Sequence, residues 1–381
     1  MAERRCWTGS KTIPSRRKAR SSAASTWLVP AHSEVPLILP MQGAPAAKID
    51  RTSLARAEAL ARRHFGIAGS VSVLSSERDE TFLIRAADGC GYILKIAAAD
   101  ERADVLQFQS DALAHLSTKR LVVPVPRPVA SANGEMLVSV PSREGPRIMR
   151  VLTYLEGMLL SHAPRQKTQL AALGRALASI GEGLADFHTV VPRQELVWDL
   201  CRAWSLHDLV PFVETARRPL VTKVLDAYGL ARGALHELPR QVIHNDFNPH
   251  NILVDPAMPE KVTGIIDFGD MVEAPAVNDL AVALAYHVFS GPGLEDVATI
   301  VRAYAAIRPL SRLELAVLPT LVRTRLAMTI VISEWRSSRQ PENSRYILRN
   351  HAAALAGLAK LADWSDDELG RFFQDMMGDR S

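Results

Sequence analysis

Short runs of apolar residues separated by polar turns mark the chain between residues 71 and 154. The runs 71–74, 81–85 and 91–96 come first, and 136–140 and 148–154 follow after an intervening segment. Runs of this kind, bounded by Gly, Asp and Ser, are typical of strands in an antiparallel sheet. We therefore predict five β-strands in this part of the chain.

A helical period dominates most of the remaining chain. Ser53 precedes a predicted amphipathic helix as its N-cap, and residues 104–116 predict a second helix. From Gln166 to Phe187, apolar residues recur at spacings of 3 and 4, which is the spacing of one helix face. Further helices are predicted within 202–240, from 277 onwards, at 315–334 and at 346–361. The pattern divides the chain into a small β-rich part and a larger helical part.

The stretch Val242–Val254 interrupts the helical part with an apolar strand, a polar turn and a second apolar strand. The turn holds Asp246 and Asn251 behind His244, and a further apolar segment ends at Asp267. Asp and Asn also favour turns for conformational reasons alone, so either half by itself is modest support for a site. Together, the two halves bring two carboxylates and an amide to one point, as phosphoryl transfer requires.

The order His-x-Asp-x-x-x-x-Asn followed by Asp-Phe-Gly resembles the signature of protein kinases. The version in this chain has Ile-Ile-Asp-Phe-Gly-Asp at 265–270 and Asn-Asp-Leu-Ala at 278–281. It is similar to the aminoglycoside phosphotransferase and choline kinase family. Trp-Asp-Leu at 198–200 and His-Asn-Asp at 244–246 resemble its hydroxylysine kinase branch, with Asn245 where the family commonly has Gly.

The resemblance implies an α+β, bilobal protein kinase-like fold. A small antiparallel β N-lobe that binds the nucleotide is expected at 51–152, and a larger, mainly helical C-lobe for catalysis and substrate at 153–378. The implied activity transfers the γ-phosphoryl group of ATP or GTP to a hydroxyl of an amino acid or amino alcohol. Aminoglycosides, homoserine and choline are alternative acceptors. A nucleotide-binding pseudokinase is the alternative without catalysis, and the short spacing from Gly269 to Asp279 argues against a protein substrate.

The resemblance also assigns roles around the central turn. Asp246 is expected to be the catalytic base, and Asn251 and Asp267 are expected to bind Mg²⁺. His244 would support the Asp-Phe-Gly backbone, and Asp279 would brace the catalytic turn through its backbone. For Asp279, an ordinary helix N-terminal carboxylate is the competing interpretation.

Nucleotide contacts are expected in the N-lobe. Lys95 lies on the third predicted strand, where kinases place a lysine that binds the α- and β-phosphates. Gln109 matches the position that orients this lysine, with Asp111 as the other candidate. The turn before the second strand lacks glycine, and Ser76 and Arg78 are weak candidates for phosphate contacts there.

The remaining candidates concern the purine and the acceptor. Thr153 and Leu155 fall at the expected hinge between the lobes, where main-chain groups bind the purine, so the sequence does not separate ATP from GTP. A cationic acceptor needs carboxylates nearby. Asp270, Glu273 and Asp199 are the candidates for that role, and Arg325 is a weaker candidate for binding a substrate carboxylate. Each of these four also has an ordinary interpretation as a surface or capping charge.

Charge and composition add little to this picture. Residues 1–40 carry seven Lys and Arg against two Glu, 7 − 2 = +5, so the remainder of the +4 chain carries 4 − 5 = −1. We therefore expect a disordered basic tail at 1–40, or an upstream extension of a start at Met41, with a targeting segment as a further alternative. We expect no nucleic-acid or membrane partner. The three cysteines show no metal-ligand spacing or disulfide framework, which favours the cytoplasm. The oligomeric state is left open.

Overall fold

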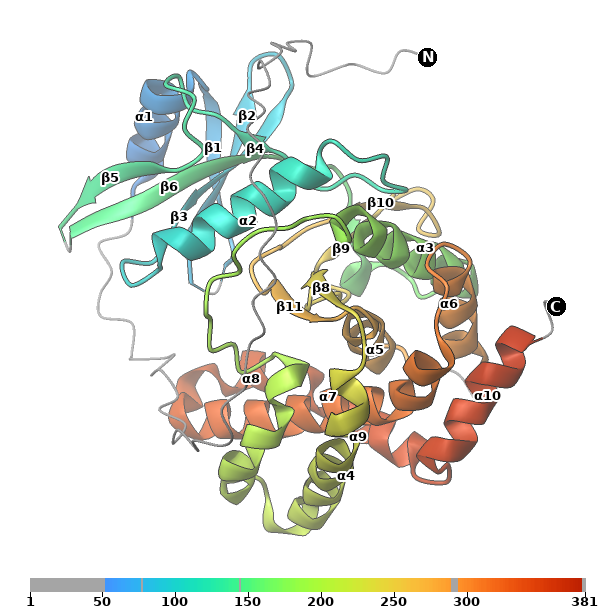
Figure 1. Cartoon of the computed structure of the whole chain (residues 1–381). Helices are drawn as coiled ribbons and strands as arrows, with labels where there is room; N and C mark the ends of the chain where they lie inside the picture. The colour runs from blue at the N-terminus through green and yellow to red at the C-terminus, as the bar shows by residue number, and fades with distance from the viewer. Residues whose placement is uncertain (1–51, 77, 144, 289–293, 379–381) are drawn as a thin grey trace, which may run out of the picture. The chain divides into compact units, whose positions relative to one another are not determined.

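The computed structural model describes residues 52–76, 78–143, 145–288 and 294–378. The predicted tail at 1–40 lies outside these residues and stays a prediction. Within the described residues, a β-rich part is followed by a mainly helical part (Figure 1). This is the α+β arrangement that the sequence predicts.

Six strands build the sheet of the β-rich part, in the order β1-β2-β3-β6-β4, with β5 also paired to β6. All the pairings are antiparallel. The sequence predicts five of these strands but not β4, because two residues that include a proline carry no strand pattern. The strands are β1 (Gly69–Leu74), β2 (Glu80–Ala86), β3 (Gly91–Ile96), β4 (Pro128–Val129), β5 (Val138–Ser142) and β6 (Gly145–Thr153).

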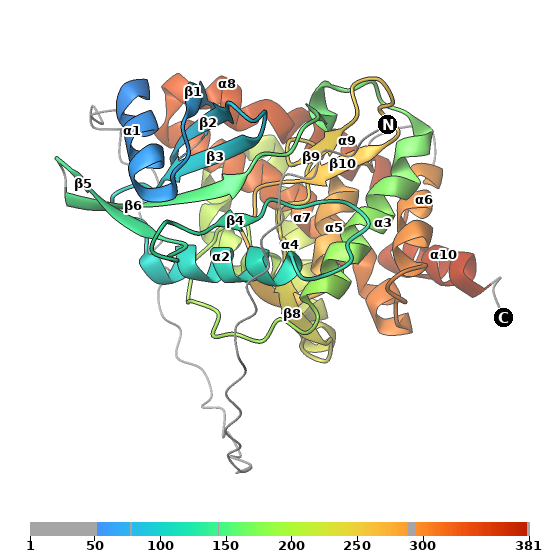
Figure 2. The ribbon, with the colours of Figure 1, turned by 90° about the horizontal axis from the view of Figure 1, so that it is seen from above.

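Two helices accompany this sheet, α1 (Leu54–Phe65) and α2 (Ala103–Leu116), with β6 and β4 between them in Figure 2. The predicted cap at Ser53 accepts a hydrogen bond from the Arg56 N–H. One face of the sheet forms a core with α1, to which the strands contribute alternate residues: Phe82, Ile84, Leu94, Ile96, Met149 and Val151. Because side chains alternate along a strand, the intervening residues, Lys95 among them, lie on the opposite face.

The helical part contains two small antiparallel sheets, one of three strands and one of two. In one, β9 (Ile252–Val254) pairs with β10 (Val262–Ile265) and with β7 (Met158–Leu159). In the other, β8 (Arg240–Ile243) pairs with β11 (Val272–Pro275). The main helices are α3 (Lys167–Leu184), α4 (Arg218–His236), α5 (Val277–Ala285), α6 (Glu295–Ala305), α7 (Arg312–Arg339), α9 (His351–Leu361) and α10 (Asp366–Gly378).

Two predicted helical segments differ in detail from the structure. The segment predicted as one helix at 346–361 is divided into α8 (Ser344–Ile347), a 3₁₀ turn at Leu348–Asn350 and α9. Residues 202–240 hold a long 3₁₀ segment, η2 (Leu200–Phe212), as well as α4. Pro211 inside η2 lacks the N–H that a continuous α-helix needs, which explains part of this difference.

Helix α7 lies at the centre of the helical part, in contact with α4, α5, α9 and α10. By length and composition alone, it is the one helix among the described residues that would suit a membrane span. However, 89% of its apolar window is buried within the protein. Its apolar side chains therefore pack in the core. Some of its buried polar side chains line a pocket described below.

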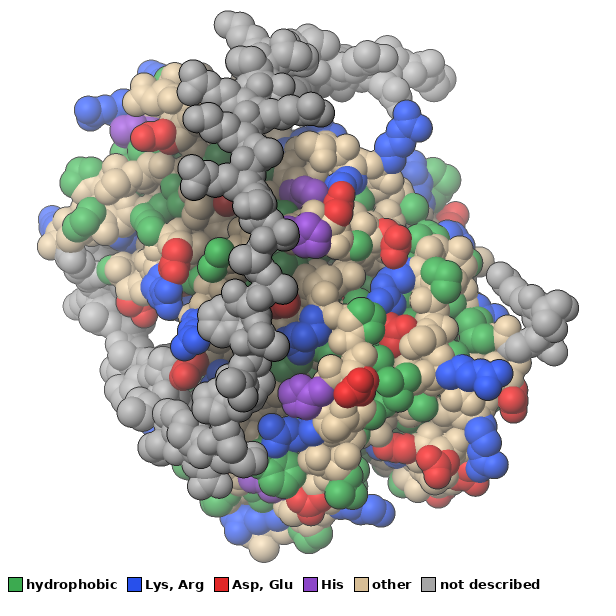
Figure 3. All heavy atoms as spheres, in the orientation of Figure 1, with side chains coloured by type: hydrophobic (Ala, Val, Ile, Leu, Met, Phe, Trp, Pro, Cys, Tyr) green, Lys and Arg blue, Asp and Glu red, His purple; other side chains and the backbone are tan. Residues whose placement is uncertain are grey.

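Charged side chains of both signs lie on the visible surface of the described residues. Where the face in Figure 3 is coloured, cationic and anionic side chains are interspersed, as the near-neutral charge of residues 41–381 predicts. Cys201 is a free, half-buried thiol.

Candidate active site

The two turns that carry the expected catalytic residues share an unusual backbone conformation. Asn245 follows β8 with φ 64°, and Asp267 follows β10 with φ 63°. This left-handed region is rarely adopted by residues other than Gly, and Asn and Asp are the side chains that tolerate it best. The conformation explains why Asn245 can stand where the family commonly has Gly. It also turns the chain sharply at the end of each strand.

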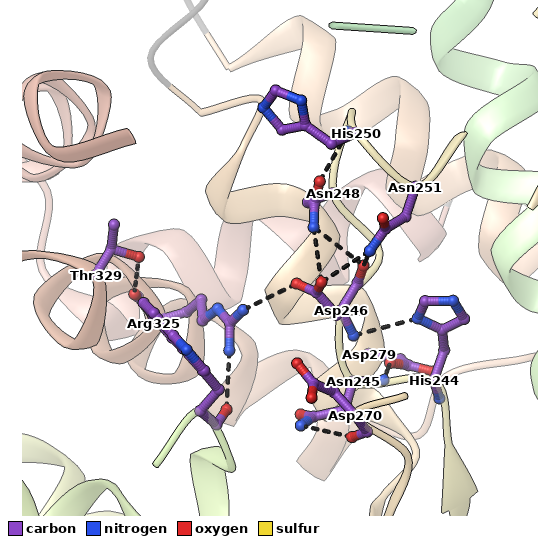
Figure 4. A network of polar contacts seen from close by, with 11 residues as sticks. His244, Asn245, Asp246, Asn248, His250, Asn251, Asp270, Asp279, Arg325 and Thr329 are labelled. Atoms are coloured by element: carbon purple, nitrogen blue, oxygen red, sulfur yellow. Dashed lines mark hydrogen bonds and ion pairs between the residues drawn. The ribbon is translucent and has the colours of Figure 1, made fainter. Parts of the chain in front are cut away.

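Asp279, on the first turn of α5, holds the catalytic turn from behind (Figure 4). Its carboxylate is 3% exposed and accepts hydrogen bonds from the backbone N–H groups of His244 at 2.9 Å and Asn245 at 2.6 Å. A carboxylate satisfied by two backbone donors is a rigid connection between a helix and a turn. The geometry is the bracing contact that the sequence predicts for this residue.

His244 connects the turn after β8 to the turn after β10. Its Nδ1 accepts a hydrogen bond from the Asp246 N–H at 3.2 Å, which assigns the ring proton to Nε2. The Nε2–H then donates to the carbonyl oxygen of Ile266 at 3.2 Å. The imidazole therefore supports the backbone just before Asp267, as predicted, and both ring nitrogens are engaged in structural bonds.

Asp246 lies at the tip of the catalytic turn with its two oxygens in different surroundings (Figure 4). Its Oδ2 accepts hydrogen bonds from the amides of Asn248 and Asn251, each at 2.8 Å. Among the described residues, Oδ1 has only a 3.4 Å contact, with Nη2 of Arg325. Burial raises the pKa of Asp246, and the Arg325 guanidinium and Asn248 oppose that rise. Oδ1 is thus the oxygen with lone pairs left for a proton.

Arg325, on α7, is buried with 1% exposure. Its Nη1 donates to the carbonyl oxygen of Trp198 at 2.8 Å, and its guanidinium lies 4.9 Å from the Trp198 ring centroid. Burial alone would lower the pKa of Arg325, but Tyr286 and Asp246 raise it, so the side chain stays cationic. The sequence offered Arg325 as a weak candidate for a substrate carboxylate. The structure engages it instead with Asp246 and Trp198.

A pocket opens beside Asp246, and we call it the Asp246 pocket. It is lined from α7 by Arg325, Thr329, Ser333 and Arg336, and from other elements by Trp198, Asn248, Asp270, Tyr286, Ile347, Arg349 and Asn350. Its ionisable wall therefore combines two carboxylates, those of Asp246 and Asp270, with three guanidinium groups. Such a wall can face an acceptor that carries both a cationic and an anionic group.

The three predicted substrate carboxylates separate in the structure. Asp270 lines the Asp246 pocket. Glu273 is exposed on β11 and does not line this pocket. Asp199 caps η2 by accepting a hydrogen bond from the Cys201 N–H at 2.8 Å, and burial raises its pKa. The structure thus brings only Asp270 to the acceptor side of Asp246.

Among the residues of the β-rich part that are predicted to bind the nucleotide or to support its site, some have contacts other than those expected. Gln109 donates to the carbonyl oxygen of Gly269 at 2.9 Å, so the expected bond from Gln109 to Lys95 is replaced by a connection to the Asp-Phe-Gly turn. The alternative residue, Asp111, accepts from Gln107 on the outer face of α2. Lys95 lies on the sheet face opposite the α1 core. Helix packing decides which strand or turn a glutamine reaches, and the sequence pattern does not show it.

The residues predicted to cover the phosphates and to form the hinge have local partners in the structure. The Ser76 hydroxyl donates to the carbonyl oxygen of Asp79 within the β1–β2 turn. Arg78 pairs with Glu101 at 3.2 Å and with Asp100 at 3.5 Å. At the hinge, Thr153 ends β6 and its hydroxyl accepts from the Arg127 N–H at 2.9 Å. Leu155 follows, with its side chain against Gly264, where an added Cβ would meet it at 2.7 Å.

Oxygen atoms suited to a divalent cation are present at the two expected positions. The Asn251 amide nitrogen donates to Asp246, which leaves the amide oxygen as a ligand, and the Asp267 carboxylate is exposed. Within the described residues, no group of three or more His, Cys, Asp or Glu is placed to hold a metal. Two protein oxygens fit Mg²⁺, which usually completes its shell with water and phosphate oxygens.

Several site residues were missed by the sequence interpretation. Asn248 lies two residues after Asp246 in the same polar turn, and that proximity was a usable signal. Tyr286, Arg336 and Arg349 are contributed by helical segments with no local motif. They enter the site only because α5, α7 and the turn before α9 pack together.

Comparisons with known proteins agree with this geometry. Solved structures with the same fold include the microcompartment-associated aminopropanol kinase, with TM-score 0.60 and 21% identity over 81% of this chain and 97% of that chain. An amicoumacin kinase is similar with TM-score 0.56 and 18% identity, over 74% of this chain and 87% of that chain. These similarities establish the bilobal kinase-like fold that the sequence predicts.

The family follows from a sequence model. Residues 70–317 match the sequence model of the phosphotransferase enzyme family, so the chain belongs to this family. Hydroxylysine kinase of Danio rerio is 26% identical over 81% of this chain and 91% of its own length, and that of Mus musculus is 25% identical over 81% and 89%. Homoserine kinase of Mesorhizobium japonicum is 26% identical over 75% and 90%. The protein is thus a phosphotransferase enzyme that acts on hydroxyl acceptors.

Proposed function

We propose that this enzyme uses a nucleoside triphosphate with Mg²⁺ to phosphorylate a hydroxyl group of a small amino acid. The observation that carries the proposal is the lining of the Asp246 pocket. It combines the expected catalytic base with a second carboxylate and three guanidinium groups. Similarity to hydroxylysine kinases and homoserine kinases supports an acceptor that has both an amino and a carboxylate group. ATP and GTP both remain donors to test.

The residues of the site divide the work of the reaction. Asp246 Oδ1 would accept the proton of the acceptor hydroxyl as its oxygen attacks the terminal phosphorus, and the nucleoside diphosphate would leave. Asn251 and Asp267 would hold Mg²⁺, whose chemistry is neutralisation of phosphate charge. Lys95 would contact the phosphates, and the main chain at Thr153 and Leu155 would contact the purine. His244 and Asp279 keep Asp246 in place through the backbone bonds described above.

The charges of the pocket favour an amino acid over other acceptors. Asp270 can bind a substrate ammonium, and Arg336 and Arg349 can bind a carboxylate, whereas a polycationic aminoglycoside would meet three guanidinium groups. Choline and amino alcohols lack the carboxylate that these arginines would bind. We also propose that the enzyme works in the cytoplasm, away from membranes and nucleic acid. The near-neutral charge of residues 41–381 and the three scattered cysteines support this proposal.

The test is a coupled assay with the full-length protein and matched acceptors. 5-Hydroxylysine and homoserine are compared with hydroxylated amines that lack the carboxylate, with choline and with kanamycin, each with ATP and with GTP. We expect turnover of one or both amino acids and weak turnover of the decarboxylated analogues. Turnover of kanamycin without turnover of the amino acids would contradict the proposed acceptor class, while the proposed kinase activity would stand. Nucleotide binding without turnover of any acceptor would favour the pseudokinase alternative.

Two variants make the acceptor assignment sharper. Arg336→Met should raise the KM for the amino acid by about 10- to 100-fold, the value of a charged hydrogen bond, and leave the KM for nucleotide unchanged. With an analogue lacking the carboxylate, the same variant should behave like wild type. Asp270→Asn should raise the KM of every acceptor that carries an ammonium group, the analogue without the carboxylate included. Equal losses of Arg336→Met on the amino acid and on this analogue, or an unchanged KM in Asp270→Asn, would contradict these roles.

A further inference from the structure

A row of three polar side chains crosses the N-lobe sheet on the face opposite the α1 core. In the register of the strands, Thr81 of β2 is opposite Lys95 of β3, and Lys95 is opposite Arg150 of β6. Their neighbours on each strand belong to the apolar core: Phe82, Leu94, Ile96, Met149 and Val151. The row must therefore lie together on the other face, since directly opposed residues of an antiparallel sheet share a face.

Two members of this row are buried with polar atoms that lack partners. Arg150 is 6% exposed and Thr81 is 6% exposed. Within the described residues, Arg150 Nε and the Thr81 hydroxyl oxygen have no hydrogen-bond partner. Buried polar groups without partners are uncommon and costly, and a guanidinium is among the most costly. A structural role would have supplied Arg150 with acceptors.

The neighbouring Arg147 shows what a structural arginine in this strand looks like. It is as buried as Arg150, at 7% exposure. Yet it donates to Glu80 at 2.8 Å, to the carbonyl oxygen of Ala97 at 2.6 Å and to that of Ile96 at 3.0 Å. The two arginines lie on opposite faces of one strand and are equally buried, but Arg147 has three acceptors, whereas Arg150 Nε has none within the described residues.

The charges around Arg150 show which way its side chain faces. Burial lowers the pKa of Arg150, and the carboxylates of Asp79, Asp267 and Glu101 oppose this. Asp79 belongs to the turn at the expected phosphate position, Asp267 is the expected metal ligand, and Glu101 is paired with Arg78. Arg150 therefore lies on the side of the sheet that faces the nucleotide site, within electrostatic reach of the metal position.

We propose that Arg150, Lys95 and Thr81 form one cross-strand cradle for the phosphate groups of the nucleotide, with Arg150 as a second cation beside Lys95. The inference rests on the proposed nucleotide-dependent function and deepens it. A phosphate group supplies oxygen acceptors for the guanidinium and for the threonine hydroxyl, and arginine binds phosphate through two N–H groups at once. The partners missing from the protein are then supplied by the nucleotide.

The experiment measures nucleotide affinity by calorimetry with the full-length protein. The probes are ATP, ADP and adenosine and the matching guanine series, with Mg²⁺ and again with EDTA. Arg150→Met should weaken triphosphate and diphosphate binding by about 10- to 100-fold and leave nucleoside binding unchanged. Arg150→Lys and Thr81→Val should give smaller losses of the same kind. If the Arg150→Met loss vanishes in EDTA, Arg150 acts through Asp267 and the metal, and the cradle is wrong.

Stability separates this role from a structural one. Arg150→Met removes a buried charge without partners, so the melting temperature of the nucleotide-free protein should stay the same or rise. Arg147→Met breaks a satisfied network and should lower the melting temperature while sparing nucleotide affinity. A large fall in stability for Arg150→Met, or an unchanged affinity, overturns the inference alone. If the wild type binds no nucleotide of either series, the proposed function fails and the inference fails with it.

Discussion

Arg325 of α7 and Asp246 of the catalytic turn are 79 positions apart in the sequence, yet Nη2 of one lies 3.4 Å from Oδ1 of the other. The guanidinium is held in place by the Trp198 carbonyl and ring, so it faces Asp246 in a fixed orientation. It opposes the rise in the pKa of Asp246 that burial causes. The guanidinium therefore favours the ionised form of Asp246, which is the form that can accept a proton.

This relationship predicts the pH profile of an Arg325→Met variant. Turnover requires ionised Asp246, so activity falls as the pH drops through the pKa of that carboxyl. Removing the guanidinium removes an effect that lowers this pKa, so the acidic limb of kcat/KM should move to higher pH. Arg336→Met, on the same helix, should change acceptor KM and leave the limb in place. A limb that does not move in Arg325→Met would contradict the role, provided that the melting temperature shows a folded protein.

Asp246→Asn should reduce kcat by about 10²- to 10⁴-fold, the usual contribution of a general base. The amide keeps the shape of the side chain, so nucleotide affinity measured by calorimetry should stay close to that of the wild type. Asp270→Asn is the matched comparison: it changes a second carboxylate of the same pocket, which is expected to bind the substrate ammonium, so it should raise the acceptor KM and leave kcat near that of the wild type. Unchanged turnover in Asp246→Asn would rule out the proposed mechanism.

The left-handed conformation of Asn245 predicts different stabilities for two small replacements. Both Asn245→Gly and Asn245→Ala lose the hydrogen bond to the Asp270 carbonyl, which is 3.1 Å long in the structure. Only alanine meets the steric cost of φ 64°. Asn245→Ala should therefore be less stable than Asn245→Gly by about 1 kcal/mol in urea unfolding. Equal stabilities would show that the turn relaxes out of this conformation.

His287 predicts a component of acid sensitivity that has nothing to do with catalysis. Burial lowers the pKa of His287 to about 3 from an ordinary 6.5, and Nδ1 contacts Arg165 Nη2 at 3.1 Å. The unfolded chain takes up this proton below pH 6.5, whereas the folded chain does so only near 3. The free energy of unfolding should thus fall by about 1.4 kcal/mol per pH unit between these values from this residue. His287→Gln should flatten the curve of melting temperature against pH in that window.

Much of the N-lobe and of the catalytic turns could be predicted from the sequence because local rules govern them. Ser53 caps α1 as a serine before an apolar period should, and strand β3 has the predicted bounds. His244, Asp246, Asn251 and Asp267 occur in a fixed local order, so the motif carried them together. Asp279 was placed by the same resemblance.

The parts that could not be predicted depend on how distant elements pack. Gln109 reaches Gly269 because of where α2 lies against the helical part. Arg325 reads as one more charge in a helix until α7 is placed beside the catalytic turn. In the sequence, Arg150 is a single polar residue within an apolar strand. Its proposed role in phosphate binding follows only from the strand register, which places it opposite Lys95. Glu273 was wrongly expected at the acceptor because closeness to Asp270 in sequence does not bring its side chain to the same face.

Helix α7 contributes Arg325, Thr329, Ser333 and Arg336 to the pocket, at successive turns along one face. The reacting groups come from the turns after the short strands, whereas this side of the pocket comes from a single, mostly buried helix. Acceptor preference can therefore diverge between descendants of one ancestor through a few substitutions on α7, with the turns that carry Asp246 and Asp267 left untouched. For the same reason, exchanging these four α7 residues between relatives is a way to change the alcohol that the enzyme accepts.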